Sequence, residues 1–209
     1  MKIAVIGSNG KAGSCILNEA IERGIDVLAI ARKEVKNSKE NLIKDVYDLN
    51  YDDVKECDVI IDALGFWTEE TLNNHTTSLM HLTKILADKP NRLLVVGGAG
   101  SLYVNKEHTV QVKDGEDFPE VFKPLANAQA NQLLEIRKVN NVNWTYVSPA
   151  ADFQADGDRT GKYILAGEEF KLNSKGESII SYKDYAIAMI DLAVNGGHNK
   201  ERVSVVREA

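Results

Sequence analysis

The chain has 209 residues, of which 44% are hydrophobic and 27% charged, and its 25 basic and 31 acidic residues give a net charge of −6. This length and composition suit one globular domain that buries a substantial core. An acidic chain without long basic runs argues against general nucleic-acid binding and against binding to an anionic membrane surface. Any phosphate that the protein holds must therefore be held locally, by backbone amides and a few placed cations.

Strand-like and helix-like segments alternate along the chain. Short apolar runs predict strands, and apolar residues that recur every three or four positions predict helices. The predicted strands are Lys2–Ile6, Asp26–Ala31, Asp58–Ala63, Arg92–Val96 and Trp144–Val147, with Arg202–Val206 as a candidate edge strand. The predicted helices are Lys11–Arg23, Thr71–Ala87, Leu125–Val139 and Tyr185–Val194, the last opened by a capping-box pattern at Ser181–Asp184.

This alternation, with short connections, predicts a parallel sheet with helices on both faces, which is an α/β doubly wound fold. Residues 1–209 are predicted to form a single domain. Residues 151–182 are rich in glycine and charge, and we expect them to form a small lobe over the carboxyl edge of the sheet. Ligands bind at that edge in such sheets, so functional residues are expected directly after the strands.

The cysteines and histidines carry little chemistry. Cys15 and Cys57 are the only cysteines, and neither has a second ligand nearby at metal spacing, so buried thiols are expected. His75 and His81 lie six residues apart on one predicted helix, which does not place them on one face, and no metal site is predicted. The chain starts directly with a strand and has no apolar run of membrane-spanning length, so we expect a cytoplasmic protein without membrane contact.

The first predicted strand runs into a GxxGxxG loop that opens the first helix. Gly7 permits a tight turn, Gly10 lets a pyrophosphate approach the backbone, and Gly13 lets the helix pack against the strand. This context favours dinucleotide binding over a structural turn, and no GK[ST] follows that would indicate a P-loop. Lys11 either touches a phosphate or is a solvated first-turn lysine. The predicted cofactor contacts of this loop are Gly7, Asn9, Gly10, Lys11, Ala12 and Gly13.

The end of the second strand bears on the choice of cofactor. An NAD-selective site usually places Asp or Glu there, whereas this strand ends in Ala31, Arg32 and Lys33. The Arg32 guanidinium can bind a 2′-phosphate through two hydrogen bonds, and no carboxylate at the strand end would repel it. The alternative is a surface arginine that follows a strand. The sequence thus favours NADP(H), with NAD(H) left open.

Further contacts are expected beyond the later strands. Asp45 and Val46 lie where a segment often covers the adenine, although Asp45 taken alone indicates only a loop carboxylate. Other predicted cofactor contacts are Ala63, Leu64, Gly65 and Gly97. Apolar side chains after the strands could line an acceptor pocket, with ordinary loop packing as the alternative for each. These candidates are Leu64, Phe66, Trp67, Leu102, Tyr103 and Phe153.

With these residues placed, the chain resembles the short-chain dehydrogenase/reductase superfamily, specifically its atypical NAD(P)H-binding members. Those members include bacterial NADH-flavin reductases, biliverdin reductase B-like flavin reductases and NmrA-like regulators. The resemblance implies a Rossmann fold over nearly the whole chain, and it places the nicotinamide end of the cofactor at Ser148, Pro149 and Ala150. Its carriers are Gly7–Gly13, Asp45-Val46, Ala63–Gly65, Gly97–Ser101, Trp144–Ala150, Asp158–Gly161 and Ile180–Ala186.

The chain departs from the superfamily in one respect that concerns catalysis. Catalytic members commonly carry a Tyr-x-x-x-Lys pair on the helix after the fourth strand, where the lysine lowers the pKa of a general acid/base tyrosine. Residues Pro124–Asn131 contain neither. Alcohol–carbonyl chemistry and sugar-nucleotide epimerisation therefore lose their main support. Ser101 lies where the superfamily's catalytic serine can lie and is the one catalytic candidate, with a turn or hydrogen-bonding residue as the alternative.

Hydride transfer from a reduced nicotinamide to a flavin or quinone needs no acid/base from the protein, because the conjugated ring takes the hydride and water supplies the proton. The sequence predicts an NAD(P)H-dependent oxidoreductase with such a small-molecule acceptor. The alternative is a non-catalytic NADP(H)-binding redox sensor of the NmrA type. Arg159 either binds an acidic substrate or a cofactor phosphate, or forms a salt bridge within its loop.

Overall fold

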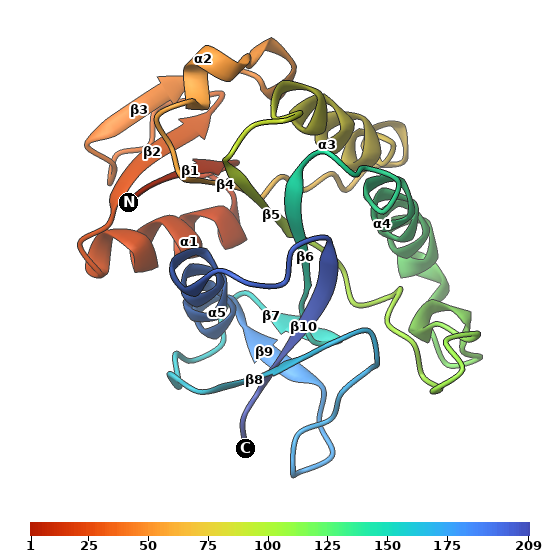
Figure 1. Ribbon diagram of the computed structural model, residues 1–209. Coiled ribbons are helices and arrows are strands. Elements are labelled where there is room, and N and C mark those ends of the chain that lie inside the picture. The colour runs from red at the N-terminus through yellow and green to blue at the C-terminus, as the bar shows by residue number, and fades with distance from the viewer.

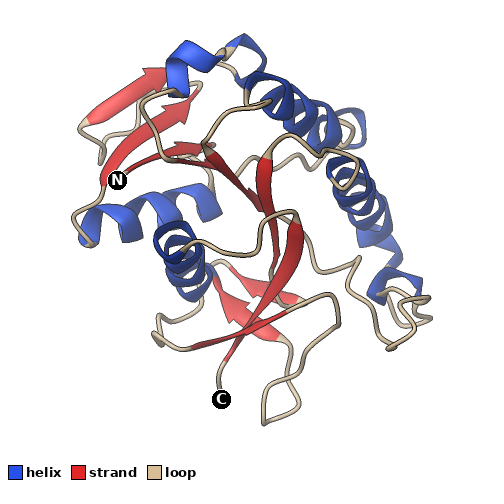
Figure 2. Ribbon diagram, viewed as in Figure 1, coloured by secondary structure: helices blue, strands red, loops and turns tan.

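The protein is built around one eight-stranded sheet with helices on both faces (Figures 1 and 2). The computed structural model describes all 209 residues. The strand order is β3-β2-β1-β4-β5-β6-β10-β8, and its first six strands follow the order of a Rossmann dinucleotide-binding sheet. The strands of the sheet are β1 (Lys2–Ile6), β2 (Asp26–Ala31), β3 (Glu40–Ile43), β4 (Val59–Asp62), β5 (Arg92–Val96), β6 (Asn143–Ser148), β8 (Tyr163–Ala166) and β10 (Glu201–Arg207).

The helices form a layer on each face of the sheet. Helices α1 (Lys11–Glu22) and α5 (Tyr182–Asn195) pack together on one face, and α3 (Asn74–Ile85) and α4 (Lys123–Ile136) on the other (Figure 1). The short helix α2 (Tyr51–Val54) precedes β4. None of these helices is long and apolar enough to cross a membrane.

Each face of the sheet has its own hydrophobic core. Ile3 and Val5 belong to a cluster of 25 buried residues under α1 and α5. Ala4 and Ile6, which alternate with them along β1, belong to a cluster of 19 under α3 and α4. Side chains alternate between the faces of a strand, so a central strand that is covered on both sides must be apolar throughout. This requirement explains why β1 shows a continuous apolar run.

The far side of the sheet differs from the sequence prediction. Residues Glu201–Arg207 form β10, but β10 is not an edge strand, because β8 pairs with it antiparallel outside it. The edge assignment was wrong because β8 is a four-residue strand inside the segment that was expected to form a lobe. Residues 151–182 thus divide: β8 extends the main sheet, and β7 (Asp152–Gln154) and β9 (Ile179–Ser181) form a small parallel sheet.

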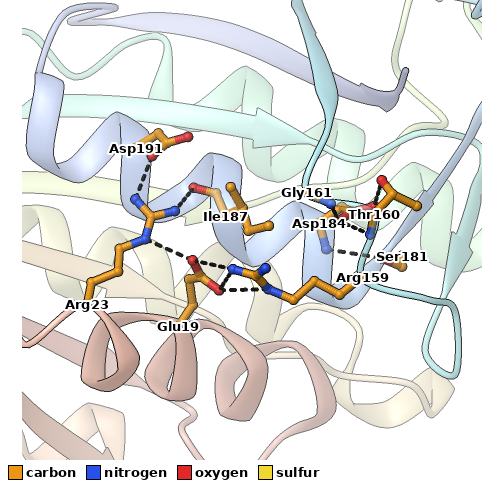
Figure 3. Close-up of polar contacts among 9 residues, drawn as sticks. All are labelled: Glu19, Arg23, Arg159, Thr160, Gly161, Ser181, Asp184, Ile187 and Asp191. Carbon is orange, nitrogen blue, oxygen red and sulfur yellow. Dashed lines mark hydrogen bonds and ion pairs between the residues drawn. The ribbon is translucent and has the colours of Figure 1, made fainter. Parts of the chain in front are cut away.

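The start of α5 ties the loop after β7 to the body of the protein (Figure 3). The Ser181 hydroxyl caps the helix by accepting from the Asp184 amide at 3.0 Å. The Asp184 carboxylate does not return this bond as a capping box would. It accepts instead from the Thr160 and Gly161 amides, both at 2.9 Å, because the loop brings those donors to it.

A second anchor lies beside this cap. The Glu19 side chain of α1 is only 5% exposed and accepts from Arg159 at 2.9 Å and from Arg23 at 2.8 Å (Figure 3). Arg23 also reaches Asp191 on α5 at 2.5 Å. Of the two roles considered for Arg159, the structure thus shows the ion pair, which ties its loop to α1.

Candidate cofactor and acceptor site

The glycine loop after β1 has the geometry that its motif requires. Gly7 has a φ of +82°, a conformation that residues with a Cβ rarely adopt, and its amide donates to the Ile30 carbonyl at 2.9 Å. A Cβ on Gly13 would lie 2.3 Å from the Gly7 carbonyl oxygen, so α1 approaches the loop only because residue 13 is glycine. Gly10 stands at the N-cap of α1 and contributes no side-chain cap. The first-turn amides of α1 are thus left to bind an anion, which the helix dipole favours.

A cavity of about 480 Å³ lies beside this loop at the carboxyl ends of β1, β2 and β4. We call it the smaller cavity. It brings together segments that are far apart in the sequence, because the carboxyl ends of parallel strands meet at one edge. The predicted cofactor residues among its lining are Gly7, Asn9, Gly10, Arg32, Asp45, Val46, Ala63, Leu64 and Gly65.

The cations of the smaller cavity differ in whether they are already paired. Arg32 and Lys33 are exposed, and neither side chain forms an ion pair or hydrogen bond within the protein. Lys44 is paired with Asp53 at 2.8 Å. Asp45, the one carboxylate of the lining, caps a short 3₁₀ helix by accepting from the Tyr47 amide at 3.1 Å. The Arg32 guanidinium thus keeps all its donors available for a phosphate at the rim.

A larger cavity, of about 750 Å³, lies at the carboxyl ends of β5 and β6. The predicted site residues that line it are Trp67, Gly97, Pro149, Ala150 and Phe153. The two cavities meet at one loop, since Phe66 lines the smaller cavity and Trp67 lines the larger. A dinucleotide with its phosphates at α1 would have its other end directed toward this second cavity.

Comparison with known proteins agrees with this geometry: residues 7–195 match the family of NAD(P)H-binding proteins. The chain belongs to this NAD(P)H-binding family. A solved structure of a putative NADH-flavin reductase from Streptococcus pneumoniae is 49% identical, covers 100% of both chains and has a TM-score of 0.97. Uncharacterized protein YwnB of Bacillus subtilis is 41% identical over 100% of both chains. A solved structure of a putative epimerase from Bacteroides thetaiotaomicron is 33% identical, covers 100% of this chain and 97% of its own, and has a TM-score of 0.85.

In this NAD(P)H-binding protein, some predicted site residues lie outside both cavities. Ser101 is 3% exposed, and its hydroxyl accepts from the fully buried Arg202 at 3.2 Å. Arg202 is held in turn by Glu168. The position of Ser101 after β5 matches the superfamily pattern, but its side chain is buried and lines neither cavity, so a catalytic role stays a prediction from the sequence.

The two residues that follow Ser101 also do not line the larger cavity. Leu102 is 1% exposed in the protein interior. The Tyr103 ring stacks on His108 with 4.6 Å between ring centroids. Both were predicted as acceptor-pocket residues, and neither lines the larger or the smaller cavity. Four predicted cofactor contacts also do not line either cavity, namely Lys11, Ala12, Gly13 and Ser148.

The larger cavity contains residues that the sequence reasoning did not identify. Tyr182, at the start of α5, lines it and packs against Phe153 with 4.0 Å between ring centroids. The Tyr182 hydroxyl is the only hydroxyl in the lining, and burial raises its pKa, so it remains protonated at neutral pH. In the sequence, Tyr182 directly follows Ser181, the predicted cap of the last helix, and this position is the signal that could have identified it. Other lining residues that were missed include Gln129 of α4, the aromatic Phe118 and Phe122, and the carboxylates of Glu116, Asp117 and Asp152.

Two buried side chains, those of His75 and Asp62, hold the loop that carries Phe66 and Trp67. His75 of α3 places its Nε2 3.0 Å from the Phe66 carbonyl oxygen, and burial lowers the His75 pKa, which keeps the ring neutral. Asp62, at the end of β4, accepts from the Leu64 amide at 3.1 Å. Burial raises the pKa of Asp62 to about 6. These contacts fix the backbone of the loop that contains Phe66 and Trp67.

Proposed function

We propose that this protein is an oxidoreductase that passes a hydride from NADPH to a planar conjugated acceptor, a flavin or a quinone. The observation that carries the proposal is the meeting of the two cavities at Phe66 and Trp67. One cavity has a phosphate-binding helix start and an unpaired arginine. The other is lined by aromatic and apolar side chains and lies where the far end of a dinucleotide would arrive.

The residues of the smaller cavity fit a dinucleotide phosphate by shape and by charge. Gly7 and Gly13 let the end of β4 and the start of α1 approach the loop, because a Cβ on Gly7 would lie 2.8 Å from the Ala63 carbonyl oxygen and one on Gly13 2.3 Å from the Gly7 carbonyl oxygen. The free amides at the start of α1 bind the pyrophosphate, and Arg32 binds the 2′-phosphate that distinguishes NADP(H) from NAD(H). When bound, the reduced nicotinamide supplies the hydride.

The larger cavity positions the acceptor. Trp67, Phe153 and Phe122 offer ring faces for a planar molecule, and Pro149 and Ala150 shape the wall after β6. No tyrosine–lysine pair stands on α4, so the protein contributes orientation rather than a proton. The proton comes from water. The name of the pneumococcal relative supports a flavin as the acceptor, whereas epimerase chemistry, as named for the Bacteroides relative, needs the tyrosine base that this chain lacks.

A turnover assay tests the proposal directly. Purified protein is mixed with NADPH and, in separate reactions, with riboflavin, FMN and a neutral quinone, and the loss of reduced-nicotinamide absorbance is followed. We expect oxidation of NADPH with at least one acceptor, at a rate proportional to protein concentration. Tight binding of NADPH without turnover on any of them would contradict the enzyme proposal and favour a redox sensor.

A further inference from the structure

The larger cavity has a one-sided charge. Its lining contains three carboxylates, those of Glu116, Asp117 and Asp152, and no lysine, arginine or histidine among its 21 residues. The rest of the lining is apolar, aromatic, glycine or amide, with the single hydroxyl of Tyr182. The cavity therefore combines a surface suited to a planar ring with a rim of negative charge.

None of these three charges is neutralised within the protein. Glu116 and Asp117 are exposed and form no ion pair or hydrogen bond through their side chains. Asp152 accepts only from the neutral Gln154 amide, at 2.8 Å. Lys113, which lies nearby in the sequence, is paired with Asp114 at 2.9 Å.

The Asp152 carboxylate is also held in place. Its strand, β7, pairs with β9, and the Asp152 amide donates to the Ser178 carbonyl at 2.9 Å. The loop that follows is tied down by the Arg159–Glu19 ion pair and by the bonds from Thr160 to Asp184 (Figure 3). These contacts hold the backbone that carries Asp152 at the wall of the cavity.

The smaller cavity has the opposite character. Its lining contains Arg32, Lys33 and Lys44 against the single carboxylate of Asp45. Two adjoining cavities at one sheet edge thus favour ligands of different charge, one with phosphates and one without.

From this contrast we propose that the larger cavity selects its acceptor by charge and takes a planar ring that is neutral or cationic, in preference to one that carries a phosphate. Among flavins, riboflavin is then a better acceptor than FMN or FAD. This inference rests on the proposed function. The reaction is NADPH + H⁺ + riboflavin → NADP⁺ + reduced riboflavin: a C–H bond of the nicotinamide breaks, its hydride forms a new bond on the flavin ring, and water supplies the proton.

The size of the effect follows from elementary electrostatics. A phosphate within about 10 Å of three partly solvated carboxylates is disfavoured by roughly tenfold at low ionic strength. Salt screens exposed charges, so this preference must shrink as the ionic strength rises. The repelling carboxylates act as a means of rejecting the wrong acceptor.

The test compares riboflavin with FMN, because the two share one redox ring and differ in the phosphate. We measure kcat/KM for each at saturating NADPH, at about 10 mM and about 300 mM salt, where the Debye lengths are roughly 30 Å and 6 Å. We expect riboflavin to be favoured roughly tenfold at low salt and less than threefold at high salt. Equal values for the two flavins at low salt, or a preference for FMN, would overturn the inference while leaving the proposed function intact. Absence of turnover with every acceptor would instead refute the proposed function.

Variants locate the source of the preference. Asp152→Asn and the double variant Glu116→Gln/Asp117→Asn should each narrow the riboflavin/FMN ratio about twofold to threefold, and the triple variant should abolish it. Asp156→Asn is the matched control, because Asp156 is exposed in the loop that directly follows β7 and does not line the cavity. It should leave the ratio unchanged. Retained NADPH affinity shows that each variant is folded. A triple variant that binds NADPH and still discriminates as the wild type does would overturn the assignment to these carboxylates.

Discussion

The smaller and larger cavities lie at the same edge of one sheet, but they are assembled in different ways. The smaller cavity is made mostly by residues that directly follow β1, β2, β3 and β4, and three of these four strands, all but β3, are visible in the sequence. The larger one combines Trp67, the glycines after β5, the segment before α4, the loop after β6 and the start of α5. The difference shows why cofactor binding can be inferred from short motifs, whereas the acceptor has to be inferred from the assembled pocket.

The largest effect is expected at Gly13, because the glycine loop beside the smaller cavity can pack against α1 only if residue 13 has no Cβ. Gly13→Ala places a Cβ 2.3 Å from the Gly7 carbonyl oxygen, so α1 must shift away from the loop. We expect a loss of about 3–4 kcal/mol in the free energy of unfolding and at least a tenfold loss in NADPH affinity. Urea unfolding and a binding titration measure the two. Gly167→Ala is the control, since a Cβ there meets nothing within 4 Å. If Gly13→Ala kept the stability and the NADPH affinity of the wild type, the close packing of α1 against the glycine loop would not be required for cofactor binding.

A second prediction concerns the loop at which the cavities meet. The pKa of Asp62 is raised to about 6 by burial, against 3.8 for an exposed aspartate, so the folded state binds the proton more tightly than the unfolded state. Ionisation of Asp62 therefore costs stability as pH rises from about 4 to about 6, in total about 3 kcal/mol. Asp62→Asn should gain that amount relative to the wild type between pH 4 and pH 7, measured by urea unfolding at both values. A difference between the two proteins that stays constant with pH would show that Asp62 titrates normally.

Arg32→Asp reduces the contrast in charge between the two cavities. The change replaces the unpaired guanidinium at the rim of the smaller cavity by a carboxylate that repels a 2′-phosphate and can hold ribose hydroxyls. We expect the ratio of NADPH to NADH affinity to fall roughly a hundredfold, by about 2.7 kcal/mol. Lys36→Asp, an exposed position of the same loop that does not line the cavity, is the matched control. An unchanged ratio in Arg32→Asp would make the 2′-phosphate assignment wrong.

The smallest effect is expected at Tyr182. Its hydroxyl has no partner within the protein, so in the larger cavity it offers the acceptor one hydrogen bond. Tyr182→Phe should raise the KM for the acceptor roughly threefold and leave kcat nearly unchanged, because water supplies the proton. The pKa of Tyr182 is raised by burial, so the hydroxyl should not titrate in the pH–rate profile between pH 6 and pH 9. A loss of kcat of a hundredfold or more would identify Tyr182 as an acid that the proposed chemistry does not require.

Local patterns in the sequence predicted the Rossmann fold, because its first half is a series of strand–loop–helix units whose signals are contiguous. The same local reasoning did not reveal that the Ser101 hydroxyl accepts from Arg202, which lies on a strand 101 residues further along the chain. It failed for the edge of the sheet, where β8 is too short to stand out and pairs with β10 across an intervening helix. Tyr182 and Asp152 reach the larger cavity only through the pairing of β7 with β9, which no periodicity predicts.

In the proposed function, the two cavities place a bound nicotinamide against an acceptor, so that a hydride crosses at the loop that lines both. Single-turnover oxidation of NADPH by riboflavin on the protein, with hydrogen or deuterium as the transferred atom at the nicotinamide C4, measures this step most directly. The account predicts rapid oxidation that is slowed severalfold by deuterium. Binding of both ligands without oxidation, or oxidation with no isotope effect on the fast phase, would contradict it.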